Sequence, residues 1–167
     1  MTRYNRPLEA IALSDYQSLA ELRYQIRRFV HFSEQAARKA RIEPRQHQLL
    51  LALKGLPEDV RPSIGVLAER LQIEPHSAVE LVNRLAKKGF VRRRRDGDGN
   101  SNGNNNNKDK HKDRRQVLLD LTPKSEKVLR KLSLHHRAEL RTAGPALMVA
   151  LLRVLKTGKP RRNFGKT

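Results

Sequence analysis

The sequence predicts a mainly helical fold with one small β-hairpin, arranged as a winged helix-turn-helix. Two short amphipathic segments lie in tandem over residues 63–89, joined by a turn at Gln72 and Ile73. An arginine-rich segment with strand character follows at 90–95, and 116–121 can pair with it as a hairpin. This hairpin is the predicted wing.

Longer helices are predicted before this motif. Ser14 is expected to cap a helix over 15–40, which an irregular arm over 1–13 precedes. A second helix should begin at Pro44, where the missing N–H costs nothing, and end at Gly55. The first helix has a face that recurs at three- and four-residue steps and can pack on helices of the same chain or of a partner. Its members are Leu19, Leu22, Ile26, Phe29, Ser33 and Ala36.

The C-terminal part is predicted to form two helices and a tail. Thr122 is expected to cap the first, with Pro123 at its first position and a stop at 144–145. The second covers 146–155, and it has too many leucines and valines to stay exposed, so it needs a partner surface. Residues 156–167 are expected to be a disordered basic tail that attracts phosphates without regard to sequence.

The hairpin itself has a strand pattern and a long connection. Between the strands, 96–113 consists largely of Gly, Asn, Lys and Asp and is expected to be a flexible insertion. In the second strand, alternation predicts one face with Val117, Leu119 and Leu121 and another with Gln116, Leu118 and Asp120.

The charge of the chain points to a polyanionic partner. Thirty-six Lys and Arg against 17 Asp and Glu leave a formal charge of +19 on 167 residues. Aromatic residues are only 4% and tryptophan is absent, so the chain has few side chains on which the bases of a single-stranded nucleic acid could stack. Double-stranded DNA is therefore the expected partner.

Several other classes of function are not expected. Without cysteine there is no disulfide, thiolate nucleophile or cysteine zinc site. The chain also lacks a glycine-rich phosphate loop and a spaced carboxylate pair, so neither an enzyme nor a bound cofactor is predicted. The longest apolar runs, 49–53 and 146–152, are too short to span a bilayer, and polar residues interrupt the N-terminus. A cytoplasmic location with no membrane contact is expected.

The second helix of the motif supplies the candidate DNA-reading residues. Ala78, Leu81, Val82 and Leu85 share one face, which should dock on the core. The opposite face should offer side chains to base edges and phosphates, unless it is merely solvated. It carries His76, Ser77, Glu80, Asn83, Arg84 and Lys87. Glu80 is expected either to accept from a cytosine amino group or to pair with Arg84.

The arginines of the wing should be divided between two faces. Successive strand residues point to opposite sides, so only about half of 92–95 can face DNA in one register. Arg93 and Arg95 are the candidates for DNA, and the others are expected to pack flat or to pair with an aspartate.

Histidines are the remaining candidates for a site. Only His135 and His136 are close in sequence, and neighbours on a helix diverge by about 100°, so no metal site is expected. Arg27, His31 and His47 are candidates to border a pocket for a small effector, although ordinary packing is the favoured interpretation.

The order of these elements resembles the MarR (multiple antibiotic resistance regulator) family of bacterial winged helix-turn-helix transcription factors, over most of 14–155. The segments that carry the resemblance are Leu67–Leu71, Val82–Leu85, Lys88–Arg92, Asp113–Arg115 and Leu119–Pro123.

The resemblance implies a homodimer held by the first and last helices, 14–42 and 123–155, with the winged helix over about 44–122. It implies binding to a pseudo-palindromic operator, commonly as a repressor, and release by a small, often phenolic, aromatic effector. Arg114 and Arg115 resemble the wing arginines of the family, with Asp113 as the carboxylate that orients them. The chain departs from the family in its Asn/Gly insertion at the wing tip.

One alternative function remains open. A nucleic-acid-binding protein without sequence preference, architectural or RNA-associated, would use the same winged helix through charge alone. Both proteins would lose affinity steeply with salt, so only sequence preference distinguishes them.

Overall fold

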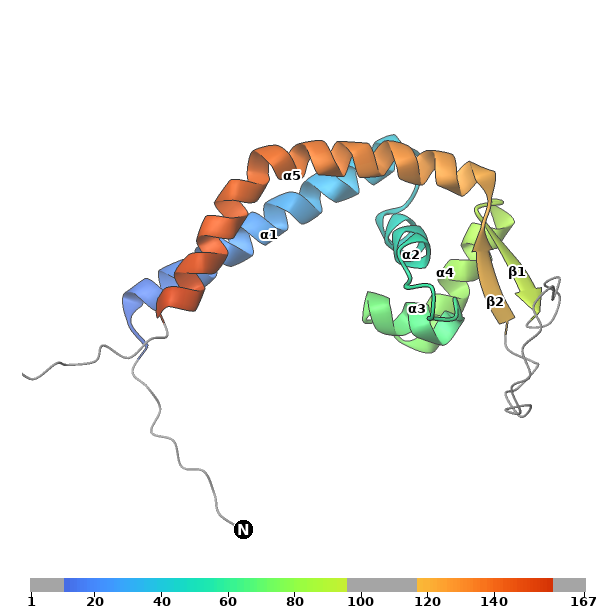
Figure 1. Ribbon diagram of the computed structural model, residues 1–167, viewed down its shortest axis with the longest axis horizontal. Coiled ribbons are helices and arrows are strands. Elements are labelled where there is room, and N and C mark those ends of the chain that lie inside the picture. Colours follow the sequence, from blue (N-terminus) through green and yellow to red (C-terminus); the bar gives the residue numbers. More distant parts are fainter. Residues whose placement is uncertain (1–10, 96–116, 158–167) are drawn as a thin grey trace, which may run out of the picture. The chain divides into compact units, whose positions relative to one another are not determined.

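The computed structural model describes residues 11–95 and 117–157. Within these ranges the chain forms five helices and a two-stranded antiparallel sheet (Figure 1). In chain order they are α1 (Leu13–Lys39), α2 (Pro44–Lys54), α3 (Ile64–Leu71), α4 (Pro75–Lys87), β1 (Val91–Arg95), β2 (Val117–Leu121) and α5 (Pro123–Thr157). The predicted fold class, mainly helical with a β-hairpin wing, is confirmed.

The chain divides into two compact units. The first contains 1–33 and 136–167, and the second contains 34–135. The second unit, called here the winged-helix unit, holds α2, α3, α4 and the hairpin. The first, called here the arm unit, holds most of α1 and the last part of α5.

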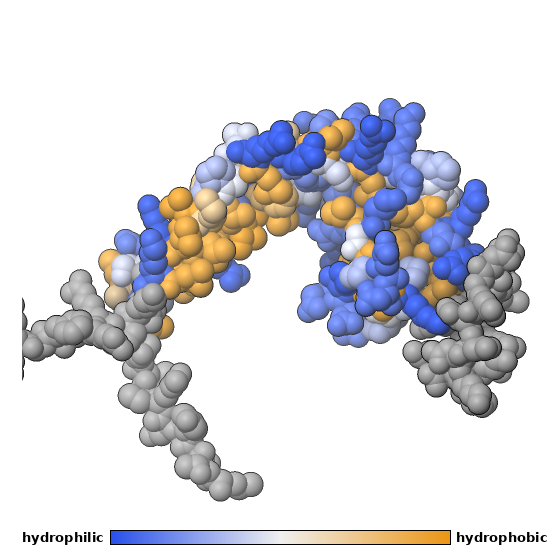
Figure 2. All heavy atoms as spheres, in the orientation of Figure 1, coloured by the Kyte–Doolittle hydropathy of each residue, from blue (hydrophilic) through white to orange (hydrophobic). Residues whose placement is uncertain are grey.

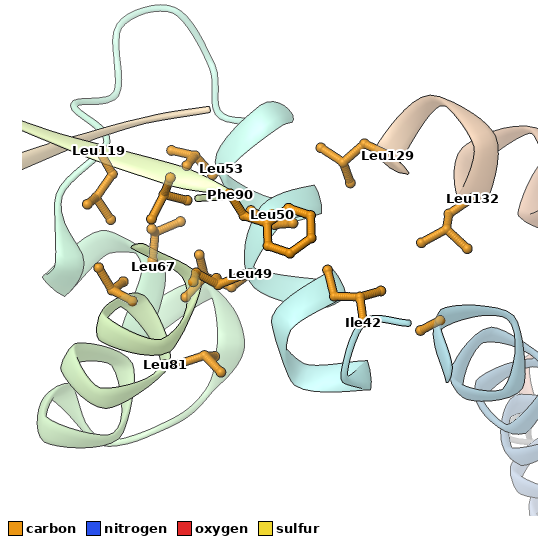
Figure 3. Close-up of a cluster of buried hydrophobic side chains, with 14 residues drawn as sticks. Ile42, Leu49, Leu50, Leu53, Leu67, Leu81, Phe90, Leu119, Leu129 and Leu132 are labelled. Carbon is orange, nitrogen blue, oxygen red and sulfur yellow. The ribbon is translucent and has the colours of Figure 1, made fainter. Parts of the chain in front are cut away.

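The winged-helix unit is built around a leucine-rich core (Figure 3). Leu49 and Leu50 of α2 are fully buried, as are Leu67 of α3 and Leu85 of α4. Leu119 of β2 is 1% exposed. These side chains come from every element of the motif, so burial of apolar surface holds the helices and the hairpin as one body.

Local capping explains where the helices of this unit begin. α2 starts at Pro44, as predicted, and the N–H of Glu43 donates to Gln46 Oε1 at 3.4 Å. Ser63 caps α3 by accepting from the N–H of Val66 at 3.3 Å, and α3 starts at Ile64.

The arm unit corrects the expected start of α1. The helix begins at Leu13, so Ser14 lies inside it and is not its N-cap. The carboxylate of Asp15 accepts from the N–H of Ala12 at 2.9 Å. An acidic side chain in the first turn thus satisfies a backbone donor just before the helix.

The same unit shows a second correction. α5 continues through Gly144 and Pro145 as one helix of 35 residues, where two helices were predicted. A proline inside a helix removes one backbone hydrogen bond, but it does not prevent helix on both sides. The leucine-rich stretch after Pro145 favours helix, and Ala150, 1% exposed, anchors it by packing.

Packing within the arm unit centres on His136, which is buried. Its Nε2 lies 2.8 Å from Ser33 Oγ, and its ring meets Phe29 and Phe32 edge-on. The predicted packing face of α1 is therefore divided. Ser33 and Phe29 contact α5 of the same chain, whereas Leu19 and Ile26 are exposed.

Exposed apolar side chains gather on the arm unit (Figure 2, left). They are Ile11, Leu13, Tyr16, Leu19, Tyr24, Ile26, Val30, Leu140, Met148, Val149, Leu151, Leu152 and Leu155. We call this set the arm surface.

The hairpin has a regular antiparallel register. Arg93 pairs with Leu119 and Arg94 with Leu118. Burial does not follow the predicted alternation of β2, because the neighbours Leu118 and Leu119 are both buried, at 3% and 1% exposure, whereas Val117 is 36% exposed. Leu118 forms a bridge with Ser63, which lies before α3, so this part of β2 has neighbours on both edges.

Candidate nucleic-acid interface

Helix α4 has one buried and one exposed face, as predicted. It begins at Pro75, and Ala78, Val82 and Leu85 are fully buried, with Leu81 at 7% exposure. The candidate DNA-contacting side chains lie on the opposite face, which we call the polar face of α4. His76, Glu80, Asn83, Arg84 and Lys87 are exposed and Ser77 is half-buried.

The C-terminal end of α4 is fixed by its backbone. The N–H of Gly89 donates to Ala86 O and that of Phe90 to Leu85 O, both at 2.9 Å. Gly89 has φ +72°, a conformation that strains any residue with a Cβ. This pair of bonds is the Schellman ending, and it confirms the predicted stop at Gly89.

A second set of contacts joins this end of α4 to the start of α5. Thr122 Oγ1 donates to Gly89 O at 2.9 Å, and the Thr122 N–H donates to Phe90 O at 3.2 Å. Lys124 Nζ donates to Lys88 O at 2.7 Å and lies 4.6 Å from the centre of the Phe90 ring. We call these contacts the α4–α5 junction. They fix the direction in which the polar face of α4 points.

Thr122 also caps α5, as predicted. The N–H of Ser125 donates to Thr122 Oγ1 at 3.3 Å, and the N–H of Thr122 donates to Ser125 Oγ at 2.9 Å. Both side chains are buried, so the cap and the junction share the same protected hydroxyl.

Two contacts order the polar face of α4. Arg84 Nη2 lies 3.3 Å from Glu80 Oε2, so of the two roles open to Glu80 the structure shows the ion pair. Asn83 Oδ1 accepts a hydrogen bond from the guanidinium of Arg93 on β1. The second contact links the helix to the wing, and sequence reasoning did not foresee it.

The arginines of β1 are divided between the two faces of the hairpin. Arg93 approaches α4, while Arg94 pairs with Asp120, with Nε–Oδ2 at 3.0 Å. Arg94, which was not among the arginines predicted to face DNA, thus pairs with an aspartate, one of the two roles expected for such a residue. Arg95 is the last residue of β1, and its side chain is outside the description. Asp113, Arg114 and Arg115 also lie outside the described residues.

The three candidate effector residues do not come together within either unit. Arg27 and His31 are exposed on α1 of the arm unit, and His47 is buried in the winged-helix unit. Over the described ranges, no group of three or more His, Asp or Glu side chains is placed to hold a metal ion. None of the described helices is both long and apolar enough to cross a membrane.

The winged-helix unit has a cavity that sequence reasoning missed. It measures about 480 Å³ and lies between α2 and the first turns of α5. Its lining consists of Leu51, Lys54, Glu126, Lys127, Leu129, Arg130 and Ser133. Lys54 Nζ lies 2.6 Å from Glu126 Oε1 at the wall. Because the lining comes from segments about 75 positions apart, no local pattern reveals it.

Comparisons with known proteins agree with this geometry. Residues 42–99 match the model of the MarR family. No curated protein sequence matches the chain.

Solved structures of MarR regulators share the fold. AbsC, a MarR family transcriptional regulator from Streptomyces coelicolor, is 19% identical, with a TM-score of 0.64 over 90% of this chain and 95% of AbsC. A Staphylococcus aureus MepR mutant bound to an oligodeoxyribonucleotide is 16% identical, with a TM-score of 0.57 over 86% of this chain and 98% of that one.

A third structure bears on regulation. BpsR from Bordetella bronchiseptica, whose DNA binding is regulated by 6-hydroxynicotinic acid, is 19% identical, with a TM-score of 0.56 over 84% of this chain and 97% of BpsR. The predicted resemblance is confirmed: residues 42–99 match the MarR family in sequence, and the chain has the fold of MarR family transcriptional regulators.

Proposed function

We propose that this protein is a transcriptional regulator that binds double-stranded DNA through α4 and the wing. In this role α4 enters the major groove, as the second helix of a helix-turn-helix does. The observation that carries the proposal is the division of α4. Its apolar side is buried in the core, its end is fixed by the α4–α5 junction, and its polar face is exposed.

Charge supports the same partner. Arg84, Lys87, Arg92 and Arg93 are all exposed on α4 and β1, and the whole chain carries +19. Cations on a groove-binding helix and on its wing neutralise phosphates and release their counterions. The MepR mutant of the same fold is bound to an oligodeoxyribonucleotide, which supports DNA as the ligand.

The protein acts as a homodimer in this proposal. The arm surface exposes thirteen apolar side chains on α1 and α5, an arrangement typical of an association surface. A symmetric dimer buries the same surface on both copies and presents two α4 helices to DNA. Its operator is then a pseudo-palindrome with half-sites about one helical turn apart. A protein on such a site within a promoter represses transcription by blocking it.

The first test is selection of binding sites from random duplex DNA, with two variants for comparison. We expect an inverted repeat preferred by roughly 10³-fold over random duplex. Asn83→Ala should lower the preference at its own base pair by about 10-fold, because it removes a base-edge contact. Lys87→Ala should weaken binding to all sequences alike, because it removes a phosphate contact.

Tight binding at low salt with no enriched sequence would contradict the regulator and favour the alternative, a winged-helix protein that binds nucleic acid through charge alone. Of the similar structures, AbsC is a MarR family transcriptional regulator, and the DNA binding of BpsR is regulated by a small molecule, which favours the regulator.

We further propose that a small aromatic anion releases the protein from DNA by binding the cavity beside α5. About 480 Å³ is within the usual size of ligand sites. Leu51 and Leu129 offer an apolar floor, and Lys127 and Arg130 offer cations for a carboxylate or phenolate. Such a ligand also competes with Glu126 for Lys54, which disturbs the first turn of α5 where the α4–α5 junction lies.

Salicylate is a suitable probe for this site. In titration calorimetry we expect the double variant Lys127→Ala, Arg130→Ala to bind salicylate about 10-fold more weakly, because two charge-assisted contacts are lost. The matched variant Arg27→Ala, His31→Ala changes the effector residues expected from the sequence. Loss of binding in that variant, with the first variant unaffected, would move the effector site to α1.

A further inference from the structure

The contact between the wing and α4 has a consequence for base recognition. We infer that Arg93 is a positioning residue: it holds the carboxamide of Asn83 in one orientation, so that Asn83 offers DNA its NH₂ group as a donor in preference to its oxygen as an acceptor. This inference rests on the proposed function, and it adds which bases Asn83 selects. It is carried by the hydrogen bond from the Arg93 guanidinium to Asn83 Oδ1.

The chemistry of the two side chains fixes the orientation. A guanidinium has five N–H donors and no acceptor, whereas an asparagine amide has an oxygen that accepts and a nitrogen that donates. The atom that meets Arg93 must therefore be the amide oxygen. The NH₂ group of Asn83 then points away from Arg93, and within 11–95 and 117–157 it takes part in no hydrogen bond.

Rigid elements on both sides hold the two residues in reach. Arg93 pairs with Leu119 in the hairpin, and Val91, on the same face of β1, is buried at 3% exposure. Asn83 follows the fully buried Val82 on α4, whose end is fixed at the α4–α5 junction. The hydrogen bond thus joins a strand and a helix that the core already positions.

The neighbouring carboxylate does not compete for Arg93. Glu80, one turn before Asn83 on α4, is engaged with Arg84. The other carboxylate near β1, Asp120, is engaged with Arg94. Both of these carboxylates are therefore paired with other arginines, and Arg93 donates to the neutral amide oxygen of Asn83.

This orientation disfavours the usual reading of adenine by asparagine. That contact is bidentate: the amide oxygen accepts from adenine N6–H, and the amide nitrogen donates to N7. The oxygen of Asn83 keeps a second lone pair, but a base N–H bonded to it would lie beside the cationic guanidinium of Arg93. Donation by the NH₂ group is therefore favoured. Bases that present strong acceptors in the major groove are guanine, through O6 and N7, and thymine, through O4. The structure thus predicts guanine or thymine opposite Asn83.

The test is site selection from random duplex DNA with the full-length protein and three single variants. Asn83→Ala identifies the base pair that depends on Asn83. At that pair we expect the unchanged protein to select guanine or thymine. Arg93→Ala frees the amide oxygen, and we expect adenine to gain about 10-fold relative to the originally selected base. Arg92→Ala is the control, because it removes the same charge from an exposed neighbour on the other face of the strand.

Arg92→Ala should weaken binding overall and leave the selected base unchanged. Selection of adenine by the unchanged protein, or an unaltered base preference in Arg93→Ala, would overturn the inference while leaving the regulator intact. Enrichment of no sequence by any of the proteins would sink the proposed function and this inference together.

A measurement without DNA tests the hydrogen bond between Arg93 and Asn83 directly. The side-chain NH₂ resonances of Asn83 are assigned in the ¹⁵N spectrum by their loss in Asn83→Ala. We expect Arg93→Ala to shift them and Arg92→Ala to leave them in place. If Arg93→Ala leaves them unshifted, the hydrogen bond is absent and the inference fails whatever the protein does with DNA.

Discussion

Replacing Leu152 by glutamate is expected to turn the protein into a monomer and to weaken its binding to a two-half-site operator by roughly 100-fold or more. Leu152 is 43% exposed in the middle of the arm surface. A carboxylate there must be buried without a partner if two copies are to associate, and the cost of that burial is several kcal/mol. A monomer binds one half-site and loses the gain in effective concentration that the second half-site supplies.

The matched control is Gln35→Glu, which adds the same charge to an exposed residue of α1 that belongs to the winged-helix unit and lies outside the arm surface. Mass measurement by light scattering at micromolar protein should give a dimer for the control and a monomer for Leu152→Glu. Titration of labelled operator should then show a loss of affinity only for Leu152→Glu. A dimeric Leu152→Glu protein with full operator affinity would place the association surface elsewhere.

Truncation of Leu85 to alanine is expected to lower the free energy of unfolding by about 3 kcal/mol, within the 2–5 kcal/mol seen for such changes. Leu85 is fully buried on α4 and belongs to the core shared with α2, α3 and β2. Truncation of this side chain leaves a cavity, because the backbone holds the surrounding side chains too far apart to fill it.

Urea denaturation followed by circular dichroism measures this change. Lys87→Ala, an exposed substitution two residues along the same helix, should shift stability by less than about 0.5 kcal/mol. If the two variants unfold at the same urea concentration, then α4 is not held by the core. The conclusion that its polar face points in a fixed direction would then have to be abandoned.

Much of the winged-helix unit was predictable because local chemistry determines it. Pro44 and Pro75 mark the starts of α2 and α4, since the first helical position is the one that proline occupies without losing a hydrogen bond. Gly89 marks the end of α4 because only glycine takes its positive φ without strain. The two faces of α4 follow from the helical period alone.

What failed depended on contacts distant in sequence. Pro145 was expected to end a helix, but its cost is one lost backbone bond, and packing in the arm unit outweighs it. Strand alternation placed Leu118 on one face with Gln116 and Asp120, but it carries no information about a third segment beside β2. Leu118 forms a bridge with Ser63 and is 3% exposed.

In the candidate site, too, local features were predictable and contacts between distant segments were not. The polar face of α4 was predictable residue by residue, and the pairing of Glu80 with Arg84 was one of two stated alternatives. The bond from Arg93 to Asn83 and the cavity lined by Lys54 and Arg130 were not. Each depends on the tertiary position of a side chain that no sequence period encodes.

The unbroken course of α5 fixes the phase of the side chains that follow Pro145. Within the arm unit, one helix carries His136, which packs on α1, and also Leu152, which belongs to the arm surface. Each residue of an α-helix adds about 1.5 Å and about 100°. Inserting or deleting one residue between those two positions therefore turns Leu152 and Leu155 by about 100° relative to His136. A single-residue change near Pro145 thus alters which side chains the arm surface presents, although its composition stays the same.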